Sequence, residues 1–233
     1  MFELPHGSVD RPTAPDTNAH PAGPPTYGMR VLLVRHGETA WNADRRVQGW
    51  APAPLAERGR EQASLAGRHL AGTYDIDRVV ASDLRRTRET AALVREAGVD
   101  AELVFDRAWR ERDFGVYQGL SYEALFETYP EFAVTESGRH ALEAVPERGE
   151  SLLDCRERVL DTFDRLVADA GDETVLIVTH GGPLYALLGH LKGIDYVESI
   201  AGESQGNCAV NELRGDPEEG FAIVRENDTS YRE

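Results

Sequence analysis

The sequence predicts an α/β protein with a mostly parallel central sheet, and two observations support this fold class. Short, β-branched apolar runs, typical of strands buried on both faces, alternate with stretches whose apolar residues recur at helical spacing. Such alternation favours a parallel or mixed sheet covered by helices, which gives three layers. The 233 residues and 41% hydrophobic content suit one globular domain.

The strands are indicated by apolar runs that end at polar or turn-forming residues. They are expected at residues 31–34, 78–81, 101–105 and 174–178, followed by a hairpin of 207–213 and 221–225. The stretch GDPEEG between the last two segments is rich in turn-forming residues, which is why these segments are predicted to form a hairpin.

The helices are indicated by amphipathic spacing and by capping residues at their ends. The first helix is expected at about 58–70, and the second runs from a cap at Ser82 or Asp83 to Gly98. A third helix starts at Ser121 and is stopped by Pro130, and a fourth runs from a Ser151–Asp154 capping box to Gly171. A fifth helix follows the strand at 174–178 and has Pro183 in its first turn. Residues 109–119 show no clean period and are expected to form a loop. Residues 131–149 are expected to be irregular.

The chain is expected to contain a tail and one domain. Residues 1–28 are dominated by Pro, Gly, Thr, Asp and Asn without periodicity, which predicts a flexible or extended tail. The domain is expected to span 29–233, with an insertion or lid at about 121–149.

The composition argues against several classes of partner. A net charge of −16 disfavours nucleic acid and acidic membranes, and no apolar run approaches the roughly 20 residues of a membrane helix. The N-terminus lacks the pattern of a secretory signal, and the two cysteines form no CxxC motif. These features predict a cytoplasmic protein.

Two predicted strands end in a histidine followed by glycine. The first strand ends in Arg35, His36 and Gly37, and the strand at 174–178 ends near His180 and Gly181. Open α/β sheets bind ligands at the carboxyl ends of their strands. If the two strands are parallel neighbours, His36 and His180 face each other at that edge. A facing pair of histidines is less typical of structural core residues than a single histidine is.

Four motifs extend this pattern over most of the chain. RHGETAWN, SDLRRTRETA, the glutamate of WRERDFG, and VTHGG occur in the order found in the histidine phosphatase superfamily, which this chain therefore resembles. That superfamily includes the cofactor-dependent phosphoglycerate mutases. The resemblance covers about 29–225 and implies a three-layer α/β/α sandwich.

The resemblance also implies roles for particular residues. His36 is the expected nucleophile that becomes phosphohistidine, and Arg35 and Arg86 are expected to bind phosphate. Glu111 matches the proton donor, and His180 matches the second histidine of the phosphate pocket. These roles agree with the chemistry, because phosphoryl transfer depends on positioning and on cations that stabilise the transferring group.

Two further positions complete the expected phosphate site. Asn42 matches a phosphate-contacting position, and Gly181 can offer a backbone N–H. No cofactor is needed for this chemistry, and the sequence contains no His, Asp or Glu cluster at metal-ligand spacing. Arg85 and Arg88, beside Arg86, are expected to form a solvated helix face.

Three functions remain open at this stage: a phosphatase, a mutase of the phosphoglycerate mutase type, and a phosphate-binding pseudoenzyme. The mutases carry a lysine soon after the catalytic glutamate, an Arg-Arg pair in the insertion, and Asn after His-Gly. Residues 121–149 contain no lysine and no Arg-Arg pair, and Gly182 follows His-Gly. The sequence therefore favours a phosphatase acting on a small phosphomonoester. The substrate's identity and a homodimer are left open.

Overall fold

The computed structural model describes residues 28–202 and 204–232, so the predicted tail lies outside the described residues apart from Gly28. The described part contains a sheet of strands β1 (Met29–Arg35), β2 (Arg78–Ala81), β3 (Glu102–Phe105), β4 (Thr174–Thr179), β5 (Val210–Asp216) and β6 (Gly220–Asp228). Their order across the sheet is β3-β2-β4-β1-β5-β6. The first four strands in this order are parallel, and β5 and β6 add an antiparallel hairpin. The predicted mostly parallel sheet is confirmed.

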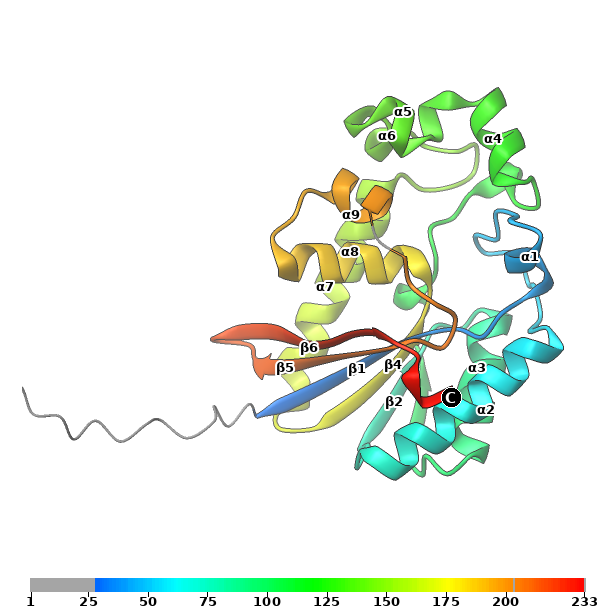
Figure 1. Cartoon of the computed structure of the whole chain (residues 1–233). Helices are drawn as coiled ribbons and strands as arrows, with labels where there is room; N and C mark the ends of the chain where they lie inside the picture. Colours follow the sequence, from blue (N-terminus) through cyan, green and yellow to red (C-terminus); the bar gives the residue numbers. More distant parts are fainter. Residues whose placement is uncertain (1–27, 203, 233) are drawn as a thin grey trace, which may run out of the picture.

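Helices cover both faces of this sheet (Figure 1). α2 (Glu57–Thr73) and α3 (Arg85–Glu96) lie on one face, and α7 (Leu152–Ala170), α8 (Gly181–Lys192) and α9 (Tyr196–Gly202) lie on the other. The predicted three-layer α/β/α sandwich is therefore confirmed. Among the helices that the structure describes, none is long and apolar enough to cross a membrane.

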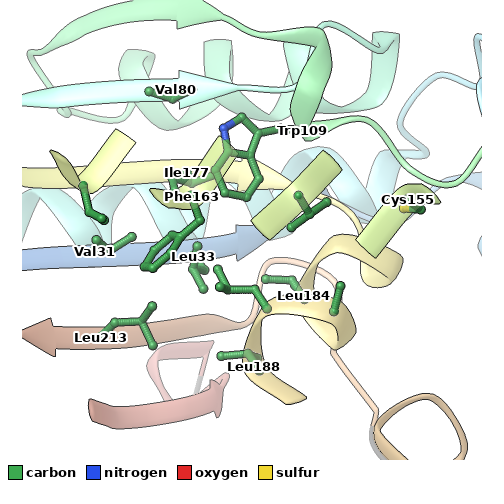
Figure 2. Close-up of a cluster of buried hydrophobic side chains, with 14 of the residues drawn as sticks. Val31, Leu33, Val80, Trp109, Cys155, Phe163, Ile177, Leu184, Leu188 and Leu213 are labelled. Carbon is green, nitrogen blue, oxygen red and sulfur yellow. The ribbon is translucent and has the colours of Figure 1, made fainter. Parts of the chain in front are cut away.

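The alternation of side chains along β1 explains its unbroken apolar sequence. Val31 and Leu33 pack in the core beneath α7 and α8, together with Phe163 (Figure 2). Leu32 and Val34 point to the opposite core, beneath α2 and α3. A strand with helices on both faces needs apolar residues at every position.

The predicted insertion forms a small group of short helices at the top of the molecule in Figure 1. They are α4 (Tyr122–Thr128), α5 (Val134–Ser137) and α6 (Arg139–Glu143), with a 3₁₀ turn at Pro130–Phe132. The helix predicted between Ser121 and Pro130 is confirmed, since the Ser121 hydroxyl accepts a hydrogen bond from Ala124 N at 3.1 Å. The prediction that 131–149 is irregular is wrong in part, because helices of one turn leave no periodic signal in a sequence.

Short turns connect several of the longer elements. Gly115–Tyr117, within the stretch 109–119 that was predicted as a loop, is a 3₁₀ turn, and so is Arg107–Trp109. α1 (Ala40–Ala43) is a single helical turn after β1. The C-terminal segment ends in a further 3₁₀ turn at Ser230–Arg232.

The two predicted helix caps have different outcomes. Ser151 and Asp154 form the predicted reciprocal capping box at the start of α7. The cap predicted at Ser82 or Asp83 is wrong, because α3 begins after Leu84 without a side-chain cap. Asp83 instead pairs with Arg110, with N–O distances of 2.5 and 2.6 Å.

Candidate active site

The register of the sheet brings the two motif histidines together. β1 and β4 are adjacent and parallel, with Arg35 opposite Thr179, and His36 N donates to Thr179 O at 2.9 Å. The imidazole rings of His36 and His180 have centroids 5.2 Å apart and planes inclined by 59°. The prediction that these residues face each other is confirmed.

The hydrogen bonds of His36 determine which ring nitrogen carries the proton. Arg86 Nε lies 3.2 Å from His36 Nε2, and a guanidinium can only donate. His36 Nε2 must therefore accept, and Nδ1 holds the proton that it donates to Gly37 O at 2.7 Å. Burial, followed by the charges of Arg86 and Arg35, holds the pKa of His36 well below its usual value. His36 is thus a buried, neutral imidazole with a lone pair on Nε2.

Arg86 is fixed in place from the far side by backbone carbonyls. Its guanidinium donates to Gly49 O at 2.8 Å and to Ala51 O at 3.2 Å. Burial lowers the pKa of Arg86 to about 10, so it remains a cation at neutral pH. Its neighbour Arg85 is exposed and pairs with Glu89 at 2.8 Å, so the choice of Arg86 as the arginine that enters the site agrees with the structure.

His180 has a partner that the sequence did not reveal. Its Nε2 lies 2.9 Å from the Ser82 hydroxyl, while its Nδ1 is buried without a hydrogen-bond partner among the described residues. Burial lowers the pKa of His180 well below its usual value, and the charge of Arg86 contributes. Ser82 is the first residue of the motif SDLRRTRETA, and this position was the only indication in the sequence that it belongs to the site. Because a serine before a helix is typical of a cap, the sequence pattern instead predicted a helix cap there.

Arg35 supplies the second cation of the site. Its Nη1 donates to Gln205 O at 2.5 Å, and its Nε is buried without a partner in the described part of the chain. A Cβ added to Gly181 would lie 3.8 Å from Arg35 Nε. Gly181 is also the first residue of α8, where a backbone N–H has no acceptor within the helix. The structure thus places Arg35 beside Gly181.

A turn before β5 supports the end of β1. Asn207 Nδ2 donates to His36 O at 2.9 Å, and Cys208 N donates to Arg35 O at 2.9 Å. This turn occupies the first residues of the predicted strand 207–213, so β5 begins only at Val210. Cys208 has a φ of 53°, which an extended strand does not allow.

Glu111 reaches the same region from the loop after β3. Its carboxylate accepts from Arg112 N at 2.9 Å and from Gly182 N at 3.2 Å. A Cβ added to Gly182 would collide with that carboxylate, so Gly182 allows Glu111 to approach the start of α8.

Asn42 has a local partner in this structure. Its Oδ1 accepts hydrogen bonds from the backbone N and the hydroxyl of Thr39, at 3.1 and 3.0 Å, in the capping box of α1. A contact between Asn42 and phosphate therefore remains a prediction.

A cavity of about 500 Å³ adjoins these groups. Arg35, Glu111, Gly181 and Gly182 line it, together with Tyr122 from the start of α4. Within residues 28–202 and 204–232, no three His, Cys, Asp or Glu side chains are arranged to hold a metal ion.

The fold and this arrangement define a class of protein. The sequence profile of the histidine phosphatase superfamily (branch 1) matches residues 31–229, so the chain belongs to that superfamily. The resemblance inferred from the four motifs is thereby confirmed.

Particular relatives are similar over about two thirds of the sequence. Phosphoglycerate mutase-like protein 4 of Arabidopsis thaliana is 35% identical over 157 residues, which cover 67% of this chain and 68% of that protein. A metal-independent phosphoserine phosphatase of the same plant is 34% identical over 158 residues, covering 67% and 66%. A probable phosphoglycerate mutase, GpmB, of Erwinia tasmaniensis is 35% identical over 171 residues, covering 71% and 76%.

Solved structures with the same fold include phosphatases. YhfR of Bacillus stearothermophilus superposes with a TM-score of 0.79 at 32% identity, covering 88% of this chain and 100% of that chain. A mycobacterial glucosyl-3-phosphoglycerate phosphatase superposes with a TM-score of 0.71 at 29% identity, covering 86% and 99%. The superfamily and its phosphatase members support phosphatase activity for this chain.

Proposed function

We propose that this protein is a metal-independent phosphomonoesterase that hydrolyses a small phosphorylated metabolite through a phosphohistidine at His36. The observation that carries the proposal is the hydrogen bond from Arg86 Nε, which requires His36 Nε2 to be the unprotonated ring nitrogen. A neutral imidazole aimed by its other nitrogen is a good nucleophile. One relative is named a metal-independent phosphoserine phosphatase, which supports hydrolysis without a metal.

In the first step, Arg86 Nε turns from His36 Nε2 to a phosphoryl oxygen of the bound ester, and the freed lone pair of Nε2 attacks the phosphorus atom. A nitrogen–phosphorus bond forms and the phosphorus–oxygen ester bond breaks. Arg35 and Arg86 carry fixed positive charge beside His36, and they stabilise the charge on the phosphoryl oxygens. The departing alkoxide takes a proton from the carboxyl group of Glu111.

In the second step, water replaces the alcohol and attacks the phosphohistidine. Glu111, now a carboxylate, accepts a proton from that water. The nitrogen–phosphorus bond breaks, inorganic phosphate leaves, and His36 regains its lone pair. One carboxyl group therefore serves both steps.

A mutase is the alternative, because several relatives are named as probable phosphoglycerate mutases. A mutase must hold a second anionic group while the phosphoryl group is on the histidine. Arg112 and Arg45 line the cavity: the Arg112 guanidinium donates to Ala144 O at 2.8 Å and to Glu150 O at 3.0 Å, whereas Arg45 is exposed. Tyr122 lies in the stretch where the mutases carry a lysine. These features support hydrolysis over return of the phosphoryl group.

One labelling experiment tests the proposal. With EDTA present, brief incubation with a ³²P-labelled phosphomonoester and an alkaline quench should leave base-stable, acid-labile label on the protein. The chased label should appear as free phosphate. Label that persists undiminished in His36→Ala would refute the assignment of His36. Return of the label to 2- or 3-phosphoglycerate with little free phosphate would establish the mutase instead. The cytoplasmic location and the homodimer remain predictions from the sequence.

A further inference from the structure

The cavity beside Glu111 lies on the leaving-group side of the proposed reaction. The ester oxygen must reach the carboxyl group of Glu111, which forms part of the cavity wall. Arg35 and Gly181, beside the expected position of the phosphate, line the same cavity. The alcohol part of the ester must therefore occupy this space during the first step. A volume of about 500 Å³ is within the range of pockets that enclose small molecules.

The wall of this cavity is dominated by aromatic side chains. They come from the loop after Glu111, from the insertion, and from α8 and α9: Phe114, Tyr122, Phe126, Phe132, Tyr185 and Tyr196. In Figure 1 the insertion helices α4, α5 and α6 stand on the same side of the molecule as α8 and α9. The rings of Tyr122 and Phe126 pack against each other with centroids 5.7 Å apart.

Several polar groups of the wall are already engaged within the protein. Both carboxylate oxygens of Glu111 accept backbone hydrogen bonds. Arg112 donates to two backbone carbonyls, and its guanidinium lies over the ring of Phe114, 4.7 Å from the centroid. Arg45 and the hydroxyl-bearing side chains of Tyr122, Tyr185 and Tyr196 also line the cavity, and the Tyr196 hydroxyl is buried without a partner among the described residues. These groups would satisfy only part of the hydrogen bonds that a polyol makes to water, so burial of a polyol here would still cost free energy. An apolar group would gain from leaving water.

We infer that this cavity binds the leaving group and that the preferred substrate is the phosphate ester of an alcohol with a large apolar or aromatic body. The inference rests on the proposed phosphatase function and adds the substrate class. It predicts that apolar contact with the alcohol, rather than hydrogen bonding to its hydroxyl groups, discriminates between substrates.

A series of n-alkyl phosphates from ethyl to hexyl tests this, because the reactivity of the primary ester stays nearly constant while the apolar area grows. The value of kcat/KM should rise about fourfold for each methylene that the cavity buries. A value that stays flat or falls along the series would overturn the inference.

A matched pair of substrates isolates polarity from size. Hexyl phosphate and sorbitol 6-phosphate have the same carbon backbone and a primary phosphate ester, but sorbitol carries hydroxyl groups along it. Hexyl phosphate should give the higher kcat/KM by at least tenfold. Faster hydrolysis of sorbitol 6-phosphate would show that the cavity recognises polyols, and the inference would be wrong.

A substitution in the wall should weaken the effect of chain length. Phe126 lines the cavity and is only partly buried, so Phe126→Ser exchanges apolar wall for a hydroxyl. The gain from ethyl to hexyl phosphate should shrink several-fold in this variant. Val145 belongs to the same insertion, is 59% exposed and does not line the cavity, so Val145→Ser should keep the full gain.

The outcomes separate this inference from the function on which it rests. Turnover of ethyl phosphate without a gain for longer esters would contradict the apolar pocket and leave the phosphatase intact. No release of phosphate from any ester would contradict the phosphatase itself. If Phe126→Ser fails to fold, the alkyl series and the matched pair on the unaltered protein still decide the question.

Discussion

Three oxygen atoms of Glu111 accept hydrogen bonds from the protein, whereas a solvated surface acid is hydrogen-bonded mainly to water. Its carboxylate oxygens accept hydrogen bonds from Arg112 N and Gly182 N, and its backbone O accepts from Trp50 Nε1 at 2.7 Å. Without the superfamily resemblance, Glu111 would be one acid among 41 Asp and Glu residues in the sequence. The structure separates it from the others by fixing it at the start of α8, beside the proposed phosphate site.

Glu111→Gln tests its role as the acid. An alkyl leaving group needs a proton in the transition state, so the rate of phosphorylation by an alkyl phosphate should fall by roughly 10²- to 10⁴-fold. An aryl leaving group such as p-nitrophenolate needs the proton far less and should lose much less. Single-turnover kinetics with both substrates measure the difference. An equal, small loss on both would assign the proton to another residue, with Glu38 and Asp113 as the candidates.

Ser82 and Arg86 show what single residues reveal in a sequence. Arg86 was chosen over Arg85 because SDLRRTRETA resembles a superfamily motif whose phosphate-binding arginine falls at Arg86, and the structure buries Arg86 against His36. Ser82 was misjudged, because a serine just before a helix is a strong capping signal. Its actual partner, His180, is 98 residues away in the sequence. A contact at that separation depends on the packing of β2 beside β4.

At the scale of elements, α7 positions the loop that carries Glu111. Arg158 of α7 donates to Ala108 O at 2.6 Å, to Arg110 O at 3.0 Å and to Glu111 O at 3.4 Å. The same guanidinium pairs with the carboxylate of Glu150. A planar fork with five donors can bind several carbonyls at once, which a lysine cannot do in the same geometry. Arg158 is therefore a positioning residue for Glu111.

Arg158→Met should remove this support while keeping an extended side chain. We expect the loop to shift and kcat for an alkyl phosphate to fall roughly 10- to 100-fold, since small displacements of a catalytic group are costly. The loss should be smaller for p-nitrophenyl phosphate, and this difference separates misplacement of Glu111 from general destabilisation. Arg165 is exposed on the same helix and bonds only to Thr162 among the described residues, so Arg165→Met is the matched control. Equal losses on both substrates would contradict the positioning role.

The strands and the longer helices could be predicted, and the shortest helices could not. Each strand between helices is apolar at successive positions, and α7 shows both a capping box and helical spacing. The helices α5 and α6 have four and five residues, which is too short for a periodic pattern. Their stability comes from packing against the rest of the domain, because isolated helices of this length are unstable. The aromatic wall of the cavity draws on separate segments between Phe114 and Tyr196, so its assembly depends on tertiary packing that the sequence does not show.

At the scale of the whole molecule, the active site places two histidines in a buried, cationic environment. His36 and His180 are both buried, and Arg86 lowers the pKa of each. Protonation of either imidazole would destabilise the folded state, because the new positive charge would be buried beside arginines. The fold should therefore lose stability in acid.

The free energy of unfolding should therefore fall as the pH drops below about 6.5. Both histidines have folded-state pKa values below the ordinary value of 6.5, so below that pH the unfolded chain binds more protons than the folded one. Their stabilising contribution is complete above pH 6.5 and is lost toward the folded-state pKa values, by up to about 1.4 kcal/mol per pH unit for each histidine. His69 has a lowered pKa but is only partly buried, so its share is smaller. Urea unfolding at pH 7.5, 6.0 and 5.0 and constant ionic strength measures the slope, and this range lies above the ordinary pKa values of Asp and Glu. His36→Gln should reduce the slope to roughly half, whereas a wild-type stability that is constant across these pH values would show that neither histidine is held neutral by the fold.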